Sequence, residues 1–246
     1  MRGKEPFYLF VGDLHVGSIE AVTLPAEVRN DRQKWLAQGW ADLVKRTKAE
    51  AKTKSLRLML GGDLVDLANI VDAQEIAVEL LRPLANVADE VWGVYGTPYH
   101  VGEDGVEDRS IYGQLGARGA RRAHHHWLDT GDGLLTWAHH GMPMSRDPWN
   151  ELNGHKQLAE RTYWSALQHG IGRVGYLVRH HVHRSPQGSP VSWRGVQVAV
   201  CPCWKMPDGF SGKFAPGLLP TIGALALRPG GRGLELWTYE IPRRLA

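Results

Sequence analysis

Five short apolar segments, each followed within a few residues by an acidic residue or a histidine, constrain the fold of this chain more than any other feature of its sequence. Their length and composition are typical of buried β-strands. The segments cover residues 7–11, 56–60, 91–95, 134–138 and 174–178. Because neighbouring parallel strands end at one edge of a sheet, the polar residues that follow them are expected to meet in space.

The residues that follow these segments are mainly carboxylates and imidazoles, which are common ligands of divalent metals. The motifs read Asp13-Leu14-His15, Gly62-Asp63, Gly96-Thr97-Pro98-Tyr99-His100, His139-His140-Gly141 and His181-Val182-His183. A lone Asp-x-His motif occurs often by chance, but these motifs in order predict a site for two divalent metal ions. Manganese is the first expectation, and the donor set also suits Fe, Zn or Ni.

Spacing within the motifs indicates how the ligands are shared. Side chains two residues apart in an extended segment point to the same side. Asp13 and His15 are therefore expected to bind one ion, and His181 and His183 to lie in one site. A lone carboxylate such as Asp63 is suited to bridge two ions. Two ions can clamp a phosphoryl group, activate a bridging water and steady the leaving oxygen, so the predicted reaction is hydrolysis of a phosphate ester.

The order of the motifs resembles that of the calcineurin-like metallophosphoesterase superfamily. The superfamily pattern runs Asp-x-His, Gly-Asp, Gly-Asn-His-Asp/Glu, His-Gly and Gly-His-x-His. The resemblance covers roughly residues 7–184, and the spelling is most similar to that of phage- and prophage-borne members. It implies a phosphatase or phosphodiesterase with a dinuclear metal centre and a metal-activated water.

The middle motif departs from this pattern. Thr97 stands where the superfamily has a metal-binding Asn, and His100 comes two positions later than the superfamily's catalytic His. The resemblance implies that His100 stabilises the transition state and protonates the leaving oxygen. Thr97 is either a weaker oxygen ligand or a residue behind the ligands, so one ion is expected to bind more loosely. The same departure supports a second hypothesis, a degenerate metal-binding scaffold without catalytic activity.

The histidine motifs leave one choice open. His140 directly precedes Gly141, as the superfamily's ligand does, and is assigned to the metal site in preference to His139. His139 would then point to the other face or act behind the ligands, with the alternative that it is itself a ligand. His180 stands where the pattern has Gly. The predicted metal ligands are Asp13, His15, Asp63, His140, His181 and His183.

The order of elements predicts the fold class. Helices are expected over residues 30–53 and 72–87, and strand–helix–strand order over 7–95 predicts parallel pairing through helical crossovers. Hairpins are expected where 125–128 meets 134–138, 191–193 meets 196–200, and 223–227 meets 234–241. These elements predict an α/β fold with two packed mixed β-sheets flanked by helices, an αββα sandwich. Residues 1–246 are expected to form a single domain.

The segment 142–172 is expected to wall the substrate pocket, because it combines cationic and aromatic residues that suit a nucleotide. Arg146, Asn150 and, from a later loop, Trp204 are the predicted substrate contacts. In the other interpretation, Leu158, Trp164 and Leu167 are on the buried side of a helix. The expected substrate is a phosphorylated small molecule or a nucleotide. A nuclease that acts on DNA ends or single strands is the alternative.

Charge, cysteine content and the length of apolar runs limit the partners and the location that can be expected for the chain. The chain carries 29 basic and 26 acidic residues, a net charge of +3, and the basic cluster at 118–122 is either a nucleic-acid contact or a solvated face. Cys201 and Cys203 are expected to be core thiols. No apolar run approaches the about 20 residues that cross a bilayer, and no signal peptide is evident, so a cytoplasmic location without membrane contact is predicted.

Overall fold

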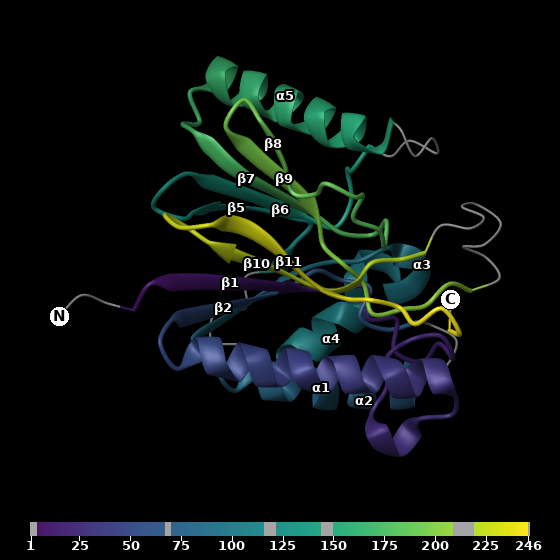
Figure 1. The fold of residues 1–246 in the computed structure, drawn as a ribbon. Coiled ribbons are helices and arrows are strands. Elements are labelled where there is room, and N and C mark those ends of the chain that lie inside the picture. Colours follow the sequence, from purple (N-terminus) through teal and green to yellow (C-terminus); the bar gives the residue numbers. More distant parts are fainter. Residues whose placement is uncertain (1–3, 67–69, 116–121, 144–149, 209–218, 246) are drawn as a thin grey trace.

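Two β-sheets face each other, and helices cover their outer faces (Figure 1). The structure, a computed structural model, describes residues 4–66, 70–115, 122–143, 150–208 and 219–245. This arrangement confirms the predicted αββα sandwich. The basic cluster at 118–122 lies almost wholly outside the described residues.

The first sheet has six strands in the order β11-β10-β1-β2-β3-β4. Its strands are β1 (Pro6–Val11), β2 (Ser55–Leu60), β3 (Glu90–Val94), β4 (Arg122–Ala123), β10 (Ile222–Arg228) and β11 (Gly233–Tyr239). Strands β1 to β4 run parallel, as the helical crossovers predict, whereas β10 pairs antiparallel with both β1 and β11.

The second sheet has five strands in the order β5-β6-β7-β9-β8. Its strands are β5 (His125–Asp129), β6 (Leu134–Ala138), β7 (Val174–Arg179), β8 (Val191–Trp193) and β9 (Val196–Val200). Strands β6, β7 and β9 run parallel, and β5 and β8 pair with them as antiparallel edge strands. The three predicted hairpins are therefore all present.

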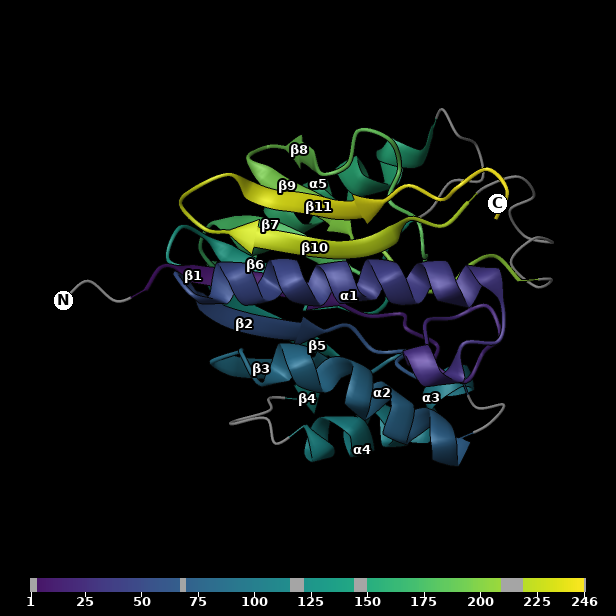
Figure 2. The same ribbon diagram turned by 60° about the horizontal axis from the view of Figure 1, so that its bottom comes forward.

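Helices pack on the outer face of each sheet (Figures 1 and 2). The longer ones are α1 (Asp31–Ala51), α2 (Ile70–Ala85), α4 (Val106–Gln114) and α5 (Glu151–His169). The short ones are α3 (Pro98–Val101) and the 3-10 turns Pro25–Glu27 and Glu103–Gly105. The Asn30 side chain caps α1 by accepting a hydrogen bond from the Gln33 N–H. None of the helices in the described part of the chain is long and apolar enough to cross a bilayer.

Three apolar layers hold these parts together. One lies between the first sheet and α1, α2 and α4, and another lies between the second sheet and α5. The middle layer joins the two sheets, with Phe10 from β1 packing edge-on against Trp137 from β6. Cys201 lies in this layer as a free, buried thiol, and Cys203 is also free and buried, as expected. The residues that follow β1, β2, β6 and β7 meet at a common edge of the two packed sheets.

Candidate metal centre

Carboxylates from the first sheet meet histidines from the second sheet at this edge. Asp13 and Asp63 follow β1 and β2, and both side chains are fully buried. The ladder between these strands continues past their ends, because the Asp13 and His15 N–H groups donate to the Gly62 and Asp63 carbonyls at 2.9 Å. The imidazoles that face them follow β6 and β7: His139, His140, His181 and His183.

A first group of ligand atoms consists of Asp13, His15 and His183. Nε2 of His15 lies 2.9 Å from Nε2 of His183, which lies 3.4 Å from Oδ1 of Asp13. The other ring nitrogen of His15, Nδ1, is buried without a hydrogen-bond partner. Two imidazole nitrogens and a carboxylate oxygen that converge in this way form a donor set for a divalent metal ion.

A second group of ligand atoms gathers around Asp63. His139 Nε2 lies 3.0 Å from Asp63 Oδ2, while its Nδ1 lies 2.6 Å from the Gly61 carbonyl oxygen. If Nδ1–H donates to that carbonyl, Nε2 is left free as a metal ligand. The Thr97 hydroxyl donates to Asp63 Oδ2 at 3.0 Å and lies 3.2 Å from Nδ1 of His181. Thr97 therefore lies inside this group.

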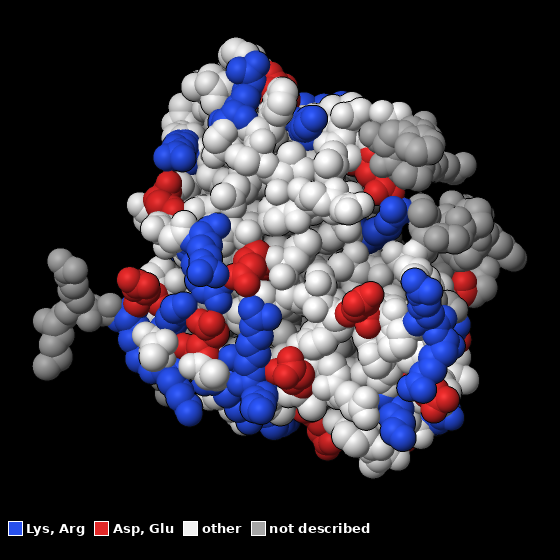
Figure 3. Space-filling model, in the orientation of Figure 1, with Lys and Arg blue, Asp and Glu red and all other residues white. Residues whose placement is uncertain are grey.

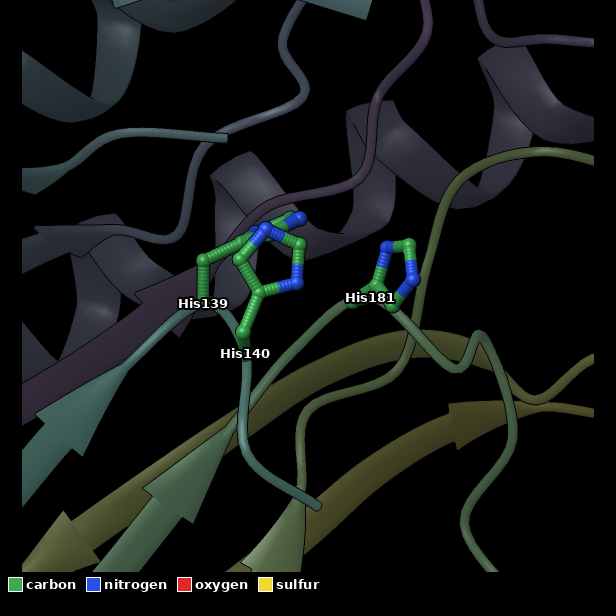
Figure 4. Close-up of side chains that lie close together, drawn as sticks. All are labelled: His139, His140 and His181. Carbon is green, nitrogen blue, oxygen red and sulfur yellow. The ribbon is translucent and has the colours of Figure 1, made fainter. Parts of the chain in front are cut away.

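His140 completes a cluster of three imidazoles. Ligand atoms of His139, His140 and His181 lie within 4.8 Å of one another (Figure 4). His139 is buried, whereas His140 and His181 are exposed, so this group opens to solvent. Asp63 belongs to two further groups, one with His15 and His100 and one with Asp13 and His139, and therefore joins the first group to the imidazoles of the second.

The structure favours the alternative role of His139. The sequence favours His140 as ligand and places His139 on the other face or behind the ligands, with the alternative that it is itself a ligand. In the structure His139 is buried against Asp63 and lies in two candidate ligand groups, while His140 lies in one. The difference arises because His139 directly follows β6, which ends at Ala138, and so lies nearer the centre of the edge. Both histidines can contribute to the second group.

The backbone explains how the ligands converge, and it is not the extended segment that the spacing suggested. Among the described residues, seven non-glycine residues have positive φ. Five of them are candidate ligands, at φ values between 48° and 73°: Asp13, His15, Asp63, His181 and His183. Such left-handed conformations are uncommon outside glycine, persist where surrounding structure enforces them, and cluster at functional sites.

Electrostatics ties the two sheets together at this edge. Burial alone would raise the pKa values of Asp13 and Asp63, but hydrogen bonds from histidines hold both well below the usual range. Burial opposes protonation of His139, yet the hydrogen bond to Asp63 and the charges of both carboxylates raise its pKa to about 9. Burial and the charge of His183 hold the pKa of His15 well below its usual value. The carboxylates therefore favour positive charge on His139, whereas His15 favours its neutral form.

His100 lies next to the first group. Its ring meets the His15 ring edge-on at 4.5 Å, and its Nδ1 lies 3.6 Å from Oδ1 of Asp66. Lys205 contacts the other oxygen of Asp66 at 3.6 Å and Asp208 at 2.8 Å. The sequence analysis did not identify Asp66, although its position three residues after Asp63 in Gly-Asp-Leu-Val-Asp is a signal that could have found it.

Asp108 is a second acidic residue that the sequence analysis missed. It is fully buried, and its two oxygens accept hydrogen bonds from the N–H groups of Leu64 at 3.2 Å and Gly96 at 2.9 Å. Burial and the charge of Asp63 raise the pKa of Asp108 to about 7. Asp108 therefore holds together the loops that carry Asp63 and Thr97. No local pattern distinguishes it from a surface residue of α4.

Trp204 is not a substrate contact. Its side chain is fully buried in the layer beneath α1, where it meets the Trp40 ring edge-on at 4.9 Å and the Tyr239 ring at 5.6 Å. A buried indole contributes apolar packing and cannot reach a ligand in solvent. The loop instead presents Lys205 to Asp66.

The segment 142–172 contributes less to the site than expected. Arg146 lies outside the described residues, and Asn150 accepts a hydrogen bond from Asn153 at the start of α5. Trp164 and Leu167 are exposed and so are not on the buried side of α5, whereas Leu158 packs against the apolar layer beneath this helix. Arg194, in the turn between β8 and β9, lies over the Trp164 ring at 5.6 Å. This turn precedes β9, at the edge opposite the ligands, so Trp164 does not wall the candidate site.

The donor set fits a pair of divalent metal ions. The site combines buried carboxylates with imidazoles whose nitrogens face them, and it leaves one buried nitrogen of His15 without a partner. Neither a scan of protein-family models nor a search of curated proteins gives a match to the chain. The resemblance to the metallophosphoesterases therefore rests on the motifs and their spacing.

The pair of His139 and Asp63 predicts how stability depends on pH in chelator-treated protein. The pKa of His139 is about 9 in the folded state, above the ordinary value of 6.5. The stabilisation that protonated His139 gives to the fold should therefore be complete below pH 6.5 and be lost as the pH rises through about 9. The free energy of unfolding should fall by roughly 3 kcal/mol at most. Urea unfolding between pH 7 and 10 measures this loss. The control variant His139→Gln should lose clearly less unfolding free energy over this pH range. Equal losses in both proteins would contradict the raised pKa of His139.

Asp63 is predicted to hold both ions. Asp63→Asn replaces one anionic oxygen with an amide that binds metal weakly, so metal bound per chain should fall while the fold is largely retained. Elemental analysis after dialysis against Mn²⁺, with circular dichroism, tests this. Asp129→Asn, at the exposed end of β5, is the matched control and should bind as the wild type does. Full metal occupancy in Asp63→Asn would count against the bridging role.

Proposed function

We propose that the chain is a metal-dependent phosphoesterase, either a phosphatase or a phosphodiesterase, that acts on a phosphorylated small molecule or a nucleotide. The observation that carries this proposal is the position of Asp63, a fully buried carboxylate between two groups of imidazoles. A carboxylate in that position suits two ions, of which manganese is the first candidate. Fe, Zn and Ni are the others.

When bound, a pair of divalent ions supplies Lewis-acid stabilisation of a phosphoryl group and a water that is acidic enough to act as nucleophile. The protein's own part is to hold the ligands in place. Asp13, His15 and His183 form one group of ligands, and His139, His140 and His181 form the other. The exposed His140 and His181 leave the second group open for substrate to approach.

His100 is the candidate proton donor to the leaving oxygen. Its Nδ1 faces Asp66, and Lys205 contacts the same carboxylate. A histidine whose Nδ1 faces a carboxylate directs Nε2 to the opposite side of the ring, and only the imidazolium form carries a proton on Nε2 that it can donate to a substrate. The partly exposed position of His100 suits this role, since its side chain is 19% exposed.

A non-catalytic metal-binding scaffold remains the second candidate, and Thr97 is the observation that favours it. The Thr97 hydroxyl donates to Asp63 and is close to His139 and His181, so it takes up space in the second group without supplying an amide oxygen. A hydroxyl is the weaker ligand, and an ion held there loosely would leave the centre incomplete.

Nucleic acid is a weaker proposal for the substrate. On the face drawn in Figure 3, most Lys and Arg residues lie beside Asp or Glu residues, and no single large basic patch covers the face. Phosphate-backbone binding depends on such a concentration of positive charge. A nuclease therefore stays the alternative within the same chemistry.

The cytoplasmic location also stays a prediction.

Hydrolysis of simple esters tests the proposed function. We expect the purified protein to hydrolyse 4-nitrophenyl phosphate or bis(4-nitrophenyl) phosphate, to lose activity on chelation and to gain activity when Mn²⁺ is added. Preference for the diester, with cleavage of DNA ends or single strands, would favour the nuclease. Bound metal without turnover of either ester would favour the scaffold and contradict the proposal.

His100 should affect turnover rather than metal binding. His100→Asn removes the proton donor, so kcat should fall about 10²–10⁴-fold while metal content stays at the wild-type value. His169→Asn, at the exposed end of α5, is the matched control and should leave both unchanged. Loss of an ion from the His100 variant would show that this histidine is a ligand instead.

A further inference from the structure

His180 is a buried imidazole beside the metal centre that belongs to none of the candidate ligand groups. It directly follows β7, where the superfamily pattern has Gly, and its side chain is fully buried. Nδ1 of His180 lies 3.3 Å from Oδ2 of Asp13. The contact therefore joins the end of the second sheet to a candidate ligand on the first.

The first sheet makes room for this ring with two glycines. A Cβ atom at Gly61 would lie 2.0 Å from Cε1 of His180, and one at Gly12 would lie 2.7 Å from its Nδ1. Contacts this short exclude any side chain at either position while the ring stays where it is. Gly12 and Gly61 each directly follow a strand, β1 and β2. The imidazole therefore occupies a slot whose shape depends on both glycines.

Trp137 fixes the tautomer of His180. The indole N–H of Trp137 donates to Nε2 of His180 at 3.2 Å. An indole nitrogen is a donor only, so Nε2 must act as the acceptor and the ring proton must be on Nδ1. That proton is directed at Oδ2 of Asp13. Trp137 is itself held in the middle layer by Phe10 and by a stacked His126 ring at 5.4 Å.

We propose that His180 is a positioning residue for Asp13, which it orients toward the first metal ion through a hydrogen bond fixed by Trp137. The inference rests on the proposed function, because it assumes that Asp13 is a ligand. Oδ2 of Asp13 accepts the hydrogen bond from His180, the His181 backbone N–H donates to both oxygens, and Oδ1 faces His183 at 3.4 Å. Such hydrogen bonds behind a ligand set its orientation, and their loss typically costs about 10–100-fold in metal affinity.

The two ions are expected to depend on His180 to different degrees. His180 contacts Asp13, which groups with His15 and His183 and also with Asp63 and His139, but not with His140 or His181. Removing the hydrogen bond should therefore weaken the ion among Asp13, His15 and His183 more than the other ion. A ring that only fills space would not discriminate between the two ions.

Two variants of nearly equal shape separate these roles. His180→Asn keeps an N–H donor near the position of Nδ1, whereas His180→Leu has a similar branched outline and no donor. Mn²⁺ titration followed by calorimetry and by electron paramagnetic resonance measures both ions in each protein, and thermal unfolding checks the fold. We expect His180→Leu to bind one ion about 10–100-fold more weakly. His180→Asn should bind both ions within about threefold of the wild type, because it keeps the hydrogen bond that sets the affinity.

Equal affinity in His180→Leu and the wild type would overturn the proposal, and so would equal weakening in both variants. Weakening of both ions by the same factor would indicate a general packing role and also overturn it. A wild-type protein that binds two ions but hydrolyses no ester would contradict the proposed function and leave this comparison intact. A wild-type protein that binds no ion would refute both.

Discussion

Two fully buried carboxylates, Asp13 and Asp63, are the constraint on which the arrangement of this site depends. An isolated charge in a protein interior is very costly unless opposite charge and hydrogen bonds surround it. In this fold the compensation comes from both sheets: Thr97 donates to Asp63 from the first, and His139, His180 and the backbone N–H of His181 contact the two carboxylates from the second. The edge where the strands end is therefore both the electrostatic contact between the sheets and the candidate metal centre. The five ligands in left-handed conformations are held there by that contact.

Much of the fold could be predicted from the sequence because its signals are local. Apolar runs, turn residues and helical spacing identify the strands, the hairpins and α1 without knowledge of tertiary contacts. The meeting of Asp13, Asp63 and His181 could also be predicted, because each residue comes just after a parallel strand and such strands end at one edge. The six-stranded sheet further needs β10 beside β1, a pairing between distant segments that spacing alone does not specify.

The rest depends on backbone geometry and on partners far along the chain. Choosing between His139 and His140 requires knowing which imidazole faces Asp63, a residue more than seventy positions away. Trp204 comes from a loop that follows the last histidine motif, His181-Val182-His183, yet its ring packs in the layer beneath α1. In the sequence, His180 differs from other histidines only in standing where the superfamily pattern has Gly. Its slot becomes visible when Gly12, Gly61 and Trp137 are brought together by the two sheets.

The most direct test of this account is the anomalous scattering of Mn²⁺ in crystals of the wild-type protein. The account predicts two peaks at the common edge of the sheets. One should lie among Asp13, His15 and His183, the other beside His139 and His181, and the Asp63 carboxylate should contact both. A single peak that Asp63 does not contact, or manganese bound only elsewhere on the molecule, would contradict the dinuclear centre.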